Sequence, residues 1–371
     1  MRRSPPRNDP ARTAPSRNTS ARSDPARSDP GQTDPLLSVE GLTTHIETDR
    51  GTIHAVDGVD FTVGRGEIVC IVGESGSGKS VTCDSLTGIV PQPPATIVDG
   101  RVVFDGVDLI AASESERRRF RGNRIAHIFQ NPQQALDPVY TVGDQIVEAI
   151  TIHEDVSEAV ARDRAISLLR EVGIPRAASR VDEYPHEFSG GMRQRVAIAI
   201  ALAADPDLLI ADEPTTAVDV TVQARLIELF RQLRDEETSI LLITHDLRVV
   251  SSLADRVLVM FGGTIVERGP VADVFERPAH PYTQDLFGSY DALSRRERRS
   301  ARNEIPTDGC RYRRECPHAV DACADGEQPN FFAVGHSRDH VVSCVHYGPD
   351  ADPEPVLENA RSIRPSPEVS R

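Results

Sequence analysis

Lysine is nearly missing from this chain of 371 residues. It has 42 basic and 57 acidic residues, for a net charge of −15, and its single lysine is Lys79. A surface of that sign repels DNA, RNA and anionic lipid headgroups, so we expect no nucleic acid among the partners. Because Lys79 is the one lysine retained, we infer that its position needs a compact ammonium and that the planar fork of arginine would not fit.

Long apolar runs are also missing, and there is no tryptophan. The longest apolar run, Val196 to Ala204, is far shorter than the roughly 20 residues that a helix needs to cross a bilayer. Arg2 and Arg3 are not followed by the apolar stretch of an export signal. We therefore expect the chain in the cytosol, with any membrane attachment supplied by another protein.

Composition changes divide the chain into four segments. Residues 1–35 are rich in Pro and Arg with almost nothing apolar, which predicts a disordered tail. Patterns of buried strands and helices run through residues 36–290. Residues 291–350 carry Arg- and Cys-containing stretches without regular periodicity, and residues 351–371 are rich in proline. We expect 291–350 to be a small extension and 351–371 to be loose.

The main segment, 36–290, predicts an α/β core joined to an antiparallel β part. Alternating stretches at 37–48 and 53–63 indicate antiparallel strands. Short apolar runs, typical of buried parallel strands, occur at 67–72, 207–211 and 239–244.

Helical patterns interrupt this core. From about 136 to 189 we expect a helical insert, in which the stretch 156–172 ends before Gly173. A second amphipathic helix is predicted at 222–234. The fold class expected from these patterns is therefore α/β with a helical insert.

One loop matches the phosphate-binding pattern G-x-x-x-x-G-K-[ST], between a buried strand and a helix predicted at 81–87. Backbone N–H groups of such a loop wrap phosphate oxygens, and the helix N-terminus adds partial positive charge. Lys79 would bridge the β- and γ-phosphates, and the Ser80 hydroxyl would ligate Mg²⁺. The alternative is a chance Gly/Ser loop. The predicted nucleotide-binding residues are Gly73, Glu74, Ser75, Gly76, Ser77, Gly78, Lys79 and Ser80.

Three further strand ends carry side chains suited to triphosphate hydrolysis. Asp212 suits a contact to Mg²⁺, and Glu213 suits orienting or deprotonating the attacking water. His245 could hydrogen-bond the γ-phosphate, and Gln130 could touch both Mg²⁺ and the water. Because ligands bind beyond the carboxyl ends of parallel strands, we expect these four residues near the phosphate loop. Singly, each also fits an ordinary surface position.

Ser189-Gly190-Gly191 open a strongly helical run at 192–203. The exposed N–H groups and the positive end of such a helix would suit an anion, although any capped helix has the same ends.

Together, these motifs resemble the nucleotide-binding subunits of ABC transporters over about residues 37–290. The resemblance implies a P-loop ATPase domain with ATP and Mg²⁺ as cofactors. It also implies a head-to-tail dimer, in which Ser189, Gly190 and Gly191 serve the partner's nucleotide and Ala217–Asp219 crosses the interface. The partners implied are two transmembrane permease subunits, contacted through the insert, and a second ATPase subunit. The location implied is the cytoplasmic face of the cell membrane.

Three stretches resemble the oligopeptide/dipeptide importer branch of this family: Phe129–Gly143, Glu187–Arg195 and His280–Thr283. This resemblance implies peptide import together with an extracellular solute-binding protein. Nickel or another solute carried by the same branch is an alternative cargo. A soluble ABC ATPase of DNA repair or translation is an alternative class.

The sequence departs from the family at the adenine. Ile46 stands where the family usually has an aromatic residue that stacks on the base, and His45 and His54 are nearby. Loss of one stack costs about 1 kcal/mol by analogy with aromatic pairs. Base selectivity is therefore open, whereas the phosphate chemistry is unaffected.

Six cysteines are present, of which Cys70 and Cys83 are predicted core residues. In a cytosolic protein, the other four suggest a metal site rather than disulfides. Four thiolates are what a [4Fe–4S] cluster needs, and some importers of the resembled branch carry one in this extension. The absence of a C-x2-C pair weakens a zinc site, although zinc and no metal both stay open. The thiols are Cys310, Cys316, Cys323 and Cys344, and zinc could also use His318, His336, His340 or His346.

Overall fold

The computed structural model builds the described part of residues 36–290 from two sheets and the helices that pack on them. The predicted disordered tail at 1–35 lies almost entirely outside the described residues, and so does the predicted dimer-interface loop Ala217–Asp219. The structure describes residues 34–131, 135–215, 220–291 and 305–362.

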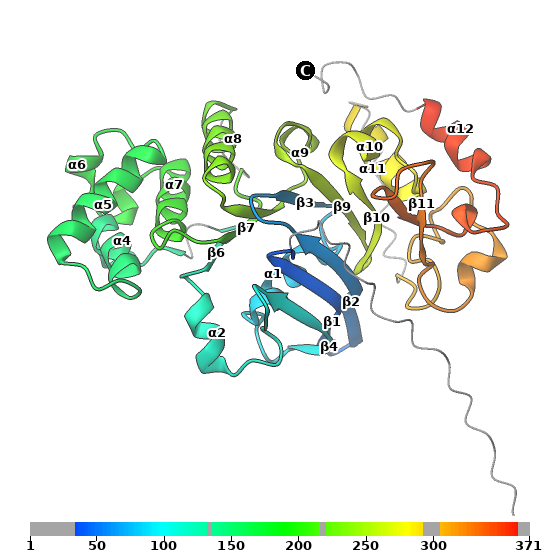
Figure 1. The fold of residues 1–371 in the computed structure, drawn as a ribbon, viewed down its shortest axis with the longest axis horizontal. Coiled ribbons are helices and arrows are strands. Elements are labelled where there is room, and N and C mark those ends of the chain that lie inside the picture. The colour runs from blue at the N-terminus through cyan, green and yellow to red at the C-terminus, as the bar shows by residue number, and fades with distance from the viewer. Residues whose placement is uncertain (1–33, 132–134, 216–219, 292–304, 363–371) are drawn as a thin grey trace, which may run out of the picture. The chain divides into compact units, whose positions relative to one another are not determined.

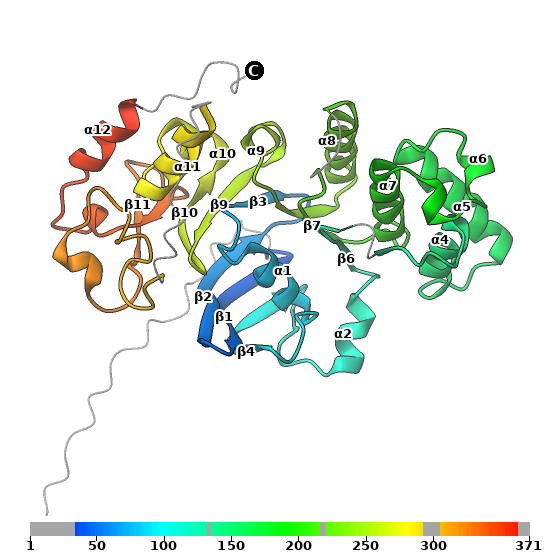
Figure 2. The ribbon, with the colours of Figure 1, turned by 180° about the vertical axis from the view of Figure 1, so that it is seen from behind.

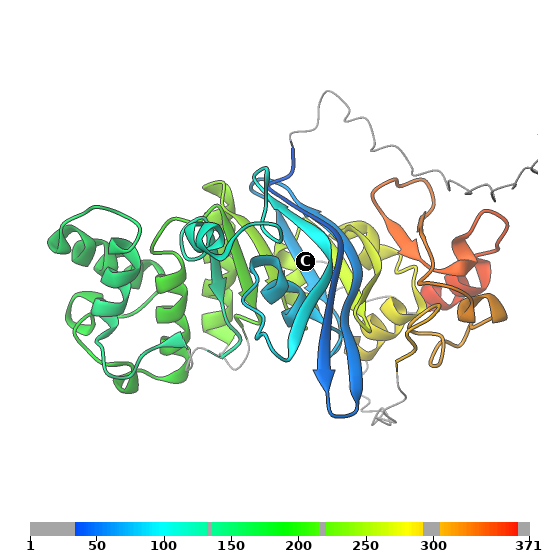
Figure 3. The same cartoon turned by 90° about the horizontal axis from the view of Figure 1, so that it is seen from below.

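The N-terminal strands form an antiparallel sheet in the order β2-β1-β4-β5. Its long hairpin pairs Leu37 with Val63 at one end and Thr48 with Gly51 at the other, as the alternating pattern predicts. Figure 3 shows this hairpin in blue. The strands are β1 (Leu37–Thr48), β2 (Gly51–Val63), β4 (Ala95–Phe104) and β5 (Val107–Asp108).

Within the described ranges, the second sheet has eight strands in the order β11-β12-β10-β9-β3-β8-β7-β6. Strands β9, β3, β8, β7 and β6 pair in parallel, and all five residues of β3 are buried, which explains its continuous apolar sequence. These parallel strands run through the middle of the ribbon in Figure 1. The bounds are β3 (Ile68–Val72), β6 (Ile125–Ile128), β7 (Leu208–Asp212), β8 (Ser239–Ile243), β9 (Arg256–Phe261) and β10 (Thr264–Pro270).

Helix α1 (Lys79–Thr87) packs between the two sheets (Figure 2). Its buried residues Cys83 and Leu86 share one apolar cluster with Val39 of β1 and Ile71 of β3. The burial of Cys83, and of Cys70 within β3, confirms both as core residues. Packing on both sides fixes the helix that carries Lys79 at its first turn.

The helical insert forms a group of helices next to strand β6 (Figure 1). Thr141 caps the first helix by accepting a hydrogen bond from the Asp144 N–H at 3.1 Å, and Gly173 follows the second with φ 76°. The predicted helical character of 136–189 is confirmed. The elements are α4 (Val142–Thr151), α5 (Glu158–Glu171), α6 (Ala177–Arg180), the 3₁₀ turn Pro185–Glu187, and α7 (Gly190–Ala201).

Of the remaining helices before the extension, the first joins the small sheet to β6, the next two connect strands of the large sheet, and the last two follow β10. They are α2 (Glu114–Phe120), α8 (Val220–Asp235), α9 (Leu247–Leu253), α10 (Val271–Glu276) and α11 (Pro281–Asp291). Helix α8 confirms the amphipathic helix predicted at 222–234. Of the helices in the described ranges, none is both long enough and apolar enough to cross a membrane.

The C-terminal extension continues the large sheet. Its short strands β11 (Phe331–Ala333) and β12 (Val341–Ser343) attach to β10, where Glu267 pairs with Val342. The 3₁₀ turns Asp321–Ala324 and Val345–Tyr347 lie near them in sequence.

Residues 351–371 were expected to be loose, but Glu354–Ser362 form helix α12, which corrects that expectation for this stretch; residues 363–371 lie outside the described part of the chain. Val356 on this helix is fully buried, and its carbonyl accepts a hydrogen bond from Nε2 of Gln284 on α11 at 3.1 Å. Proline at 353 and 355 misled the prediction, because proline is tolerated at and just before the first turn of a helix.

Candidate active site

The loop from Gly73 to Ser80 joins β3 to α1 and depends on two of its glycines. At Gly78, φ is 107°, and a Cβ would lie 2.2 Å from the carbonyl oxygen of Ala55. At Gly73, φ is 156°, and a Cβ would lie 2.2 Å from the carbonyl oxygen of Met260. Neighbouring backbone therefore leaves no room for a side chain at either position.

Lys79 is the buried cation of this loop, with 6% of its surface exposed. Its Nζ donates to the carbonyl oxygens of Gly73 at 2.9 Å and Glu74 at 2.8 Å. Burial lowers the pKa of this ammonium, and the negative charges of Glu213 and Asp212 act in the opposite direction. A phosphate group offered to the loop would replace neutral carbonyls by charged oxygens, which the ammonium binds more strongly.

Asp212 ends strand β7 beside the start of α1. Its carboxylate accepts a hydrogen bond from the Ser80 side chain, while burial raises its pKa. Its Oδ1 atom is buried and has no hydrogen-bond partner among the described residues. The Ser80 hydroxyl and an unsatisfied carboxylate oxygen are hard ligands of the kind that Mg²⁺ prefers, so these two residues fit a magnesium ion.

Glu213 lies at the centre of a polar cluster. Its Oε2 accepts a hydrogen bond from Nε2 of Gln130 at 3.2 Å, and its Oε1 lies 3.2 Å from Nδ1 of His245. The Glu213 backbone has φ 48°, and its N–H donates to the Ile243 carbonyl at 2.9 Å. The strand ends thus bring together Glu213, Gln130 and His245, as the parallel order predicts, and a carboxylate at this place could deprotonate a water bound beside it.

The Ser189 segment caps α7. The Ser189 hydroxyl accepts the Met192 N–H at 3.4 Å, and both Ser189 and Gly190 are exposed. A Cβ added at Gly190 would meet nothing within 4 Å. Further along the helix, the buried side chain of Gln194 donates to the carbonyl of Pro214, directly after Glu213. The N-terminus of α7 is therefore open to a ligand. The middle of the helix is hydrogen-bonded through Gln194 to the segment that follows Glu213.

The β1–β2 hairpin carries the residues that stand where the family usually has an aromatic side chain for the adenine. Ile46 lies opposite Ile53, which is 53% exposed, and His45 lies opposite His54 with ring centroids 4.1 Å apart. His45, His54 and Asp57 hold their ligand atoms within 4.8 Å of one another, as a metal site would require. However, Arg311 of the extension forms an ion pair with Asp57, so we interpret this group as a contact between hairpin and extension.

One residue that touches the loop was not predicted to do so. The hydroxyl of Tyr282, on α11, accepts a hydrogen bond from the Glu74 N–H at 2.9 Å. Tyr282 lies within the His280–Thr283 stretch that carried the family resemblance. The sequence offered that signal, but no pattern connected it to the phosphate loop.

The four C-terminal cysteines are buried or half-buried and interact electrostatically with one another. Burial, as the largest cause, raises the pKa of Cys316 to about 11 and that of Cys344 to about 12. Hydrogen bonds from nearby backbone N–H groups lower the same pKa values in part. The donors are Tyr312 and Arg313 for Cys310, His318 for Cys316, and His346 for Cys344.

Among the histidines considered as zinc ligands, His340 uses one ring nitrogen in another contact, while its Nδ1 atom is buried and has no hydrogen-bond partner among the described residues. Its Nε2 atom bonds Oε1 of Glu267 at 2.7 Å. Nε2 of His346 donates a hydrogen bond to the carbonyl oxygen of His318 at 2.7 Å. The Nε2 atom of His318 is buried and has no hydrogen-bond partner in the described part of the chain.

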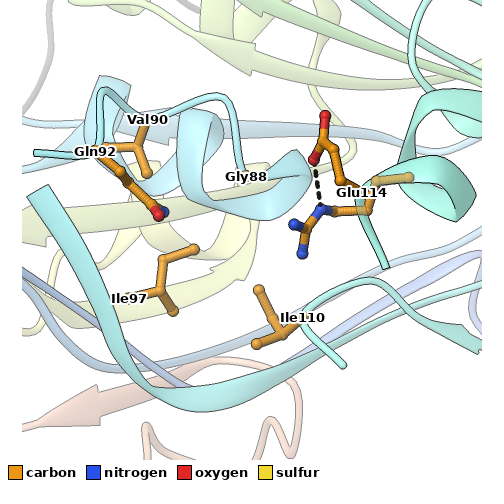
Figure 4. A pocket seen from close by; sticks show the side chains of 7 residues that line it. Gly88, Val90, Gln92, Ile97, Ile110 and Glu114 are labelled. Atoms are coloured by element: carbon orange, nitrogen blue, oxygen red, sulfur yellow. Dashed lines mark hydrogen bonds and ion pairs between the residues drawn. The ribbon is translucent and has the colours of Figure 1, made fainter. Parts of the chain in front are cut away.

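A cavity of about 430 Å³ lies beside the C-terminal end of α1 (Figure 4). Val90, Ile97 and Ile110 line it together with the Glu114–Arg117 ion pair, whose atoms are 3.2 Å apart. None of the predicted site residues lines this cavity, so it is separate from the phosphate loop.

Comparison with known proteins agrees with this geometry. The family model "ABC transporter" matches residues 56–216, and "Oligopeptide/dipeptide transporter, C-terminal region" matches residues 266–323. The oligopeptide transport ATP-binding protein AppD of Bacillus subtilis (strain 168) is 45% identical over 320 residues, which cover 84% of this chain and 97% of AppD. The dipeptide transport ATP-binding protein DppD of Escherichia coli (strain K12) is 43% identical, with 87% of this chain and 99% of DppD covered.

Solved structures show the same fold. The dimeric ATP-binding cassette MJ0796, in a post-hydrolysis state with ADP and Pi, matches with a TM-score of 0.59 and 25% identity. The match covers 64% of this chain and 99% of that cassette. The chain therefore belongs to the ATP-binding subunits of ABC transporters, a family of ATPases.

Proposed function

We propose that this ATPase drives the import of oligopeptides or dipeptides. An ABC ATPase domain implies ATP and Mg²⁺ as cofactors, and the relatives imply a membrane-associated complex of permease and ATPase subunits. The observation that carries the choice of cargo is the match of residues 266–323 to the C-terminal region of oligopeptide/dipeptide transporters. The names of AppD and DppD point in the same direction.

For hydrolysis, Lys79 and the loop amides bind the β- and γ-phosphates. Ser80, Asp212 and Gln130 are the proposed Mg²⁺ ligands, supported by the buried, unsatisfied Oδ1 of Asp212. Glu213 accepts the proton of the attacking water.

Around that water, Gln130 and His245 orient the Glu213 carboxylate through the two contacts of 3.2 Å. The exposed part of the His245 side chain, 64% of its surface, is proposed to hydrogen-bond the γ-phosphate.

The exposed end of α7 supports a site completed by another subunit. Ser189, Gly190 and Gly191 would meet the nucleotide of a second ATPase subunit, either a copy of this chain or a relative. The open space at Gly190 leaves room for that approach. The proposed location is the cytoplasmic face of the membrane, against two permease subunits, with an extracellular binding protein delivering the cargo.

Transport of labelled di- and oligopeptides tests this function. Cells that lack their own peptide importers would express the chain with its permeases and binding protein, and nickel uptake would be measured in parallel. We expect peptide uptake that is abolished by Lys79→Ala. Nickel uptake without peptide uptake would overturn the choice of cargo. Co-purification with ribosomes or DNA instead of permeases would overturn the transporter assignment.

The four C-terminal cysteines are proposed to hold a [4Fe–4S] cluster. They supply four thiols from separate segments that interact electrostatically with one another. Burial raises the pKa of Cys310, Cys316 and Cys344, and the neighbouring backbone N–H groups offset only part of that shift, so the positive charge of the bound cluster would have to keep the thiols deprotonated. A bound cluster would cross-link these segments. Anaerobic purification followed by iron, sulfide and zinc analysis tests the proposal. We expect about four irons and four sulfides per chain, and a colourless chain with one zinc would contradict it.

A further inference from the structure

We propose that Tyr282 is a positioning residue of the ATP site, which holds the phosphate loop in shape from the C-terminal region. Its hydroxyl accepts the Glu74 N–H at 2.9 Å, across 208 positions of sequence. This bond is made to a main-chain N–H of the loop. Its effect would pass through the loop backbone.

The geometry at one peptide group carries this inference. The Glu74 N–H and the Gly73 carbonyl belong to the same planar peptide unit. Tyr282 binds this unit through its N–H, while Nζ of Lys79 donates to its carbonyl oxygen at 2.9 Å. The tyrosine hydroxyl, the peptide unit and the lysine ammonium are thus joined in one line of hydrogen bonds, in which each bond polarises the next.

Tyr282 itself is held firmly. Its side chain is 1% exposed, and its ring lies 4.6 Å from the Phe261 ring and 5.4 Å from the Tyr312 ring, measured between centroids. Its backbone N–H donates to Nδ1 of His280 at 3.0 Å. A rigid donor or acceptor improves an active site because less order must be gained when the ligand binds.

The anchor extends into the Cys-bearing extension. The hydroxyl of Tyr312 donates to Asp285 on α11, and Tyr312 lies between Cys310 and Cys316 in the sequence. The packing of Tyr312 against Tyr282 therefore connects the extension to the phosphate loop. This gives the extension a role inside the ATPase site.

The substitution Tyr282→Phe tests the inference because it removes only the hydroxyl. One neutral hydrogen bond corresponds to a change in binding of about three- to ten-fold. We expect the KM for MgATP and the Kd for a non-hydrolysable ATP analogue to rise by that factor. The kcat at saturating ATP should stay within about two-fold, since no reacting group has moved.

Tyr347→Phe is the matched control. Its hydroxyl is likewise bonded to the main chain, because it donates to the carbonyl oxygen of Ala279 at 3.3 Å, but the described contacts give it no bond to the phosphate loop. Both variants and the wild type would be prepared as the full chain, with thermal unfolding measured beside ATP binding and turnover. We expect Tyr347→Phe to match the wild type in KM.

The inference rests on the proposed phosphate-binding role of the loop, and Lys79→Ala separates the two. If Lys79→Ala binds ATP as the wild type does, the site assignment itself fails. If Lys79→Ala loses binding but Tyr282→Phe keeps the wild-type KM and Kd, the positioning role of Tyr282 is wrong. A fall in kcat and in melting temperature without a change in KM would likewise reduce Tyr282 to a core residue.

Discussion

Nδ1 of His245 lies 3.2 Å from Oε1 of Glu213, at the ends of neighbouring parallel strands β8 and β7. The other carboxylate oxygen of Glu213 is held by Gln130 at 3.2 Å. A carboxylate held on both oxygens has a fixed direction in which to accept a proton.

Glu213→Gln should therefore stop hydrolysis but keep ATP binding. The amide cannot accept the proton of the attacking water, and general-base loss slows turnover by about 10²- to 10⁴-fold. Phosphate release and ATP affinity would be measured on the full chain. The exposed Glu228→Gln on α8 is the control and should be unchanged. Undiminished turnover of Glu213→Gln would remove Glu213 from the mechanism.

Two glycines of the phosphate loop should respond differently to alanine. Gly76 has φ 81° with nothing within 4 Å of an added Cβ, whereas a Cβ on Gly78 would collide with the Ala55 carbonyl at 2.2 Å. Gly76→Ala should cost about 1–2 kcal/mol from backbone strain alone. Gly78→Ala should cost more, because the collision adds to a φ of 107°. Thermal unfolding without nucleotide compares them, and equal melting temperatures would contradict this order.

The buried Glu267 should be essential for attachment of the extension. Its carboxylate accepts the N–H groups of Ala279 and His280, each at 2.8 Å, and bonds His340 at 2.7 Å. Glu267→Ala leaves these donors without their acceptor, and we expect a loss of about 3 kcal/mol or more in the free energy of unfolding. Chemical denaturation measures it, with Glu228→Ala as the exposed control. A loss below 1 kcal/mol would show that the contact is dispensable.

Stability should fall in mild acid because of His280. Complete burial lowers the pKa of His280 to about 3, whereas an unfolded histidine titrates near 6.5. Below pH 6.5 the unfolded chain takes up a proton that the folded chain refuses, so this contribution to stability is full above pH 6.5 and is lost as the pH falls toward 3. At pH 5.5 the loss from this group is about 1.4 kcal/mol.

A His280→Asn variant isolates this effect. Asp84, whose pKa is raised to about 6 mainly by burial, acts in the opposite direction between pH 4 and 6, but it is common to both chains. We expect the unfolding free energy of the variant to depend less on pH between 7 and 5 than that of the wild type. Parallel curves would mean that His280 does not titrate in this way.

Much of the site was predictable because its parts are contiguous or lie at strand ends. The phosphate loop is an unbroken pattern, and the gathering of Gln130, Glu213 and His245 follows from the parallel order of β6, β7 and β8. Such features can be predicted from short stretches of sequence, because the conformations open to glycine and the burial of an apolar run are decided within a few residues.

The contacts of the C-terminal region were not predictable in the same way. Tyr282 meets Glu74 across 208 positions, and Glu267 meets His340 across 73. Such pairs depend on how β10 and the extension pack on the large sheet, and nothing local in either partner marks the other. Helix α12 was missed for a related reason, because the burial of Val356 stabilises a segment whose composition alone suggests a loose chain.

The single lysine of the chain gives an experimental opportunity. An amine-directed reagent has only one side-chain target in this sequence, and that target is shielded, at 6% exposure, inside the loop that should hold the phosphates. Because burial lowers its pKa, a larger share of this amine is in the reactive uncharged form than in an exposed lysine. The mass added to Lys79 over time would therefore act as a footprint of the loop, without a tag or an engineered label.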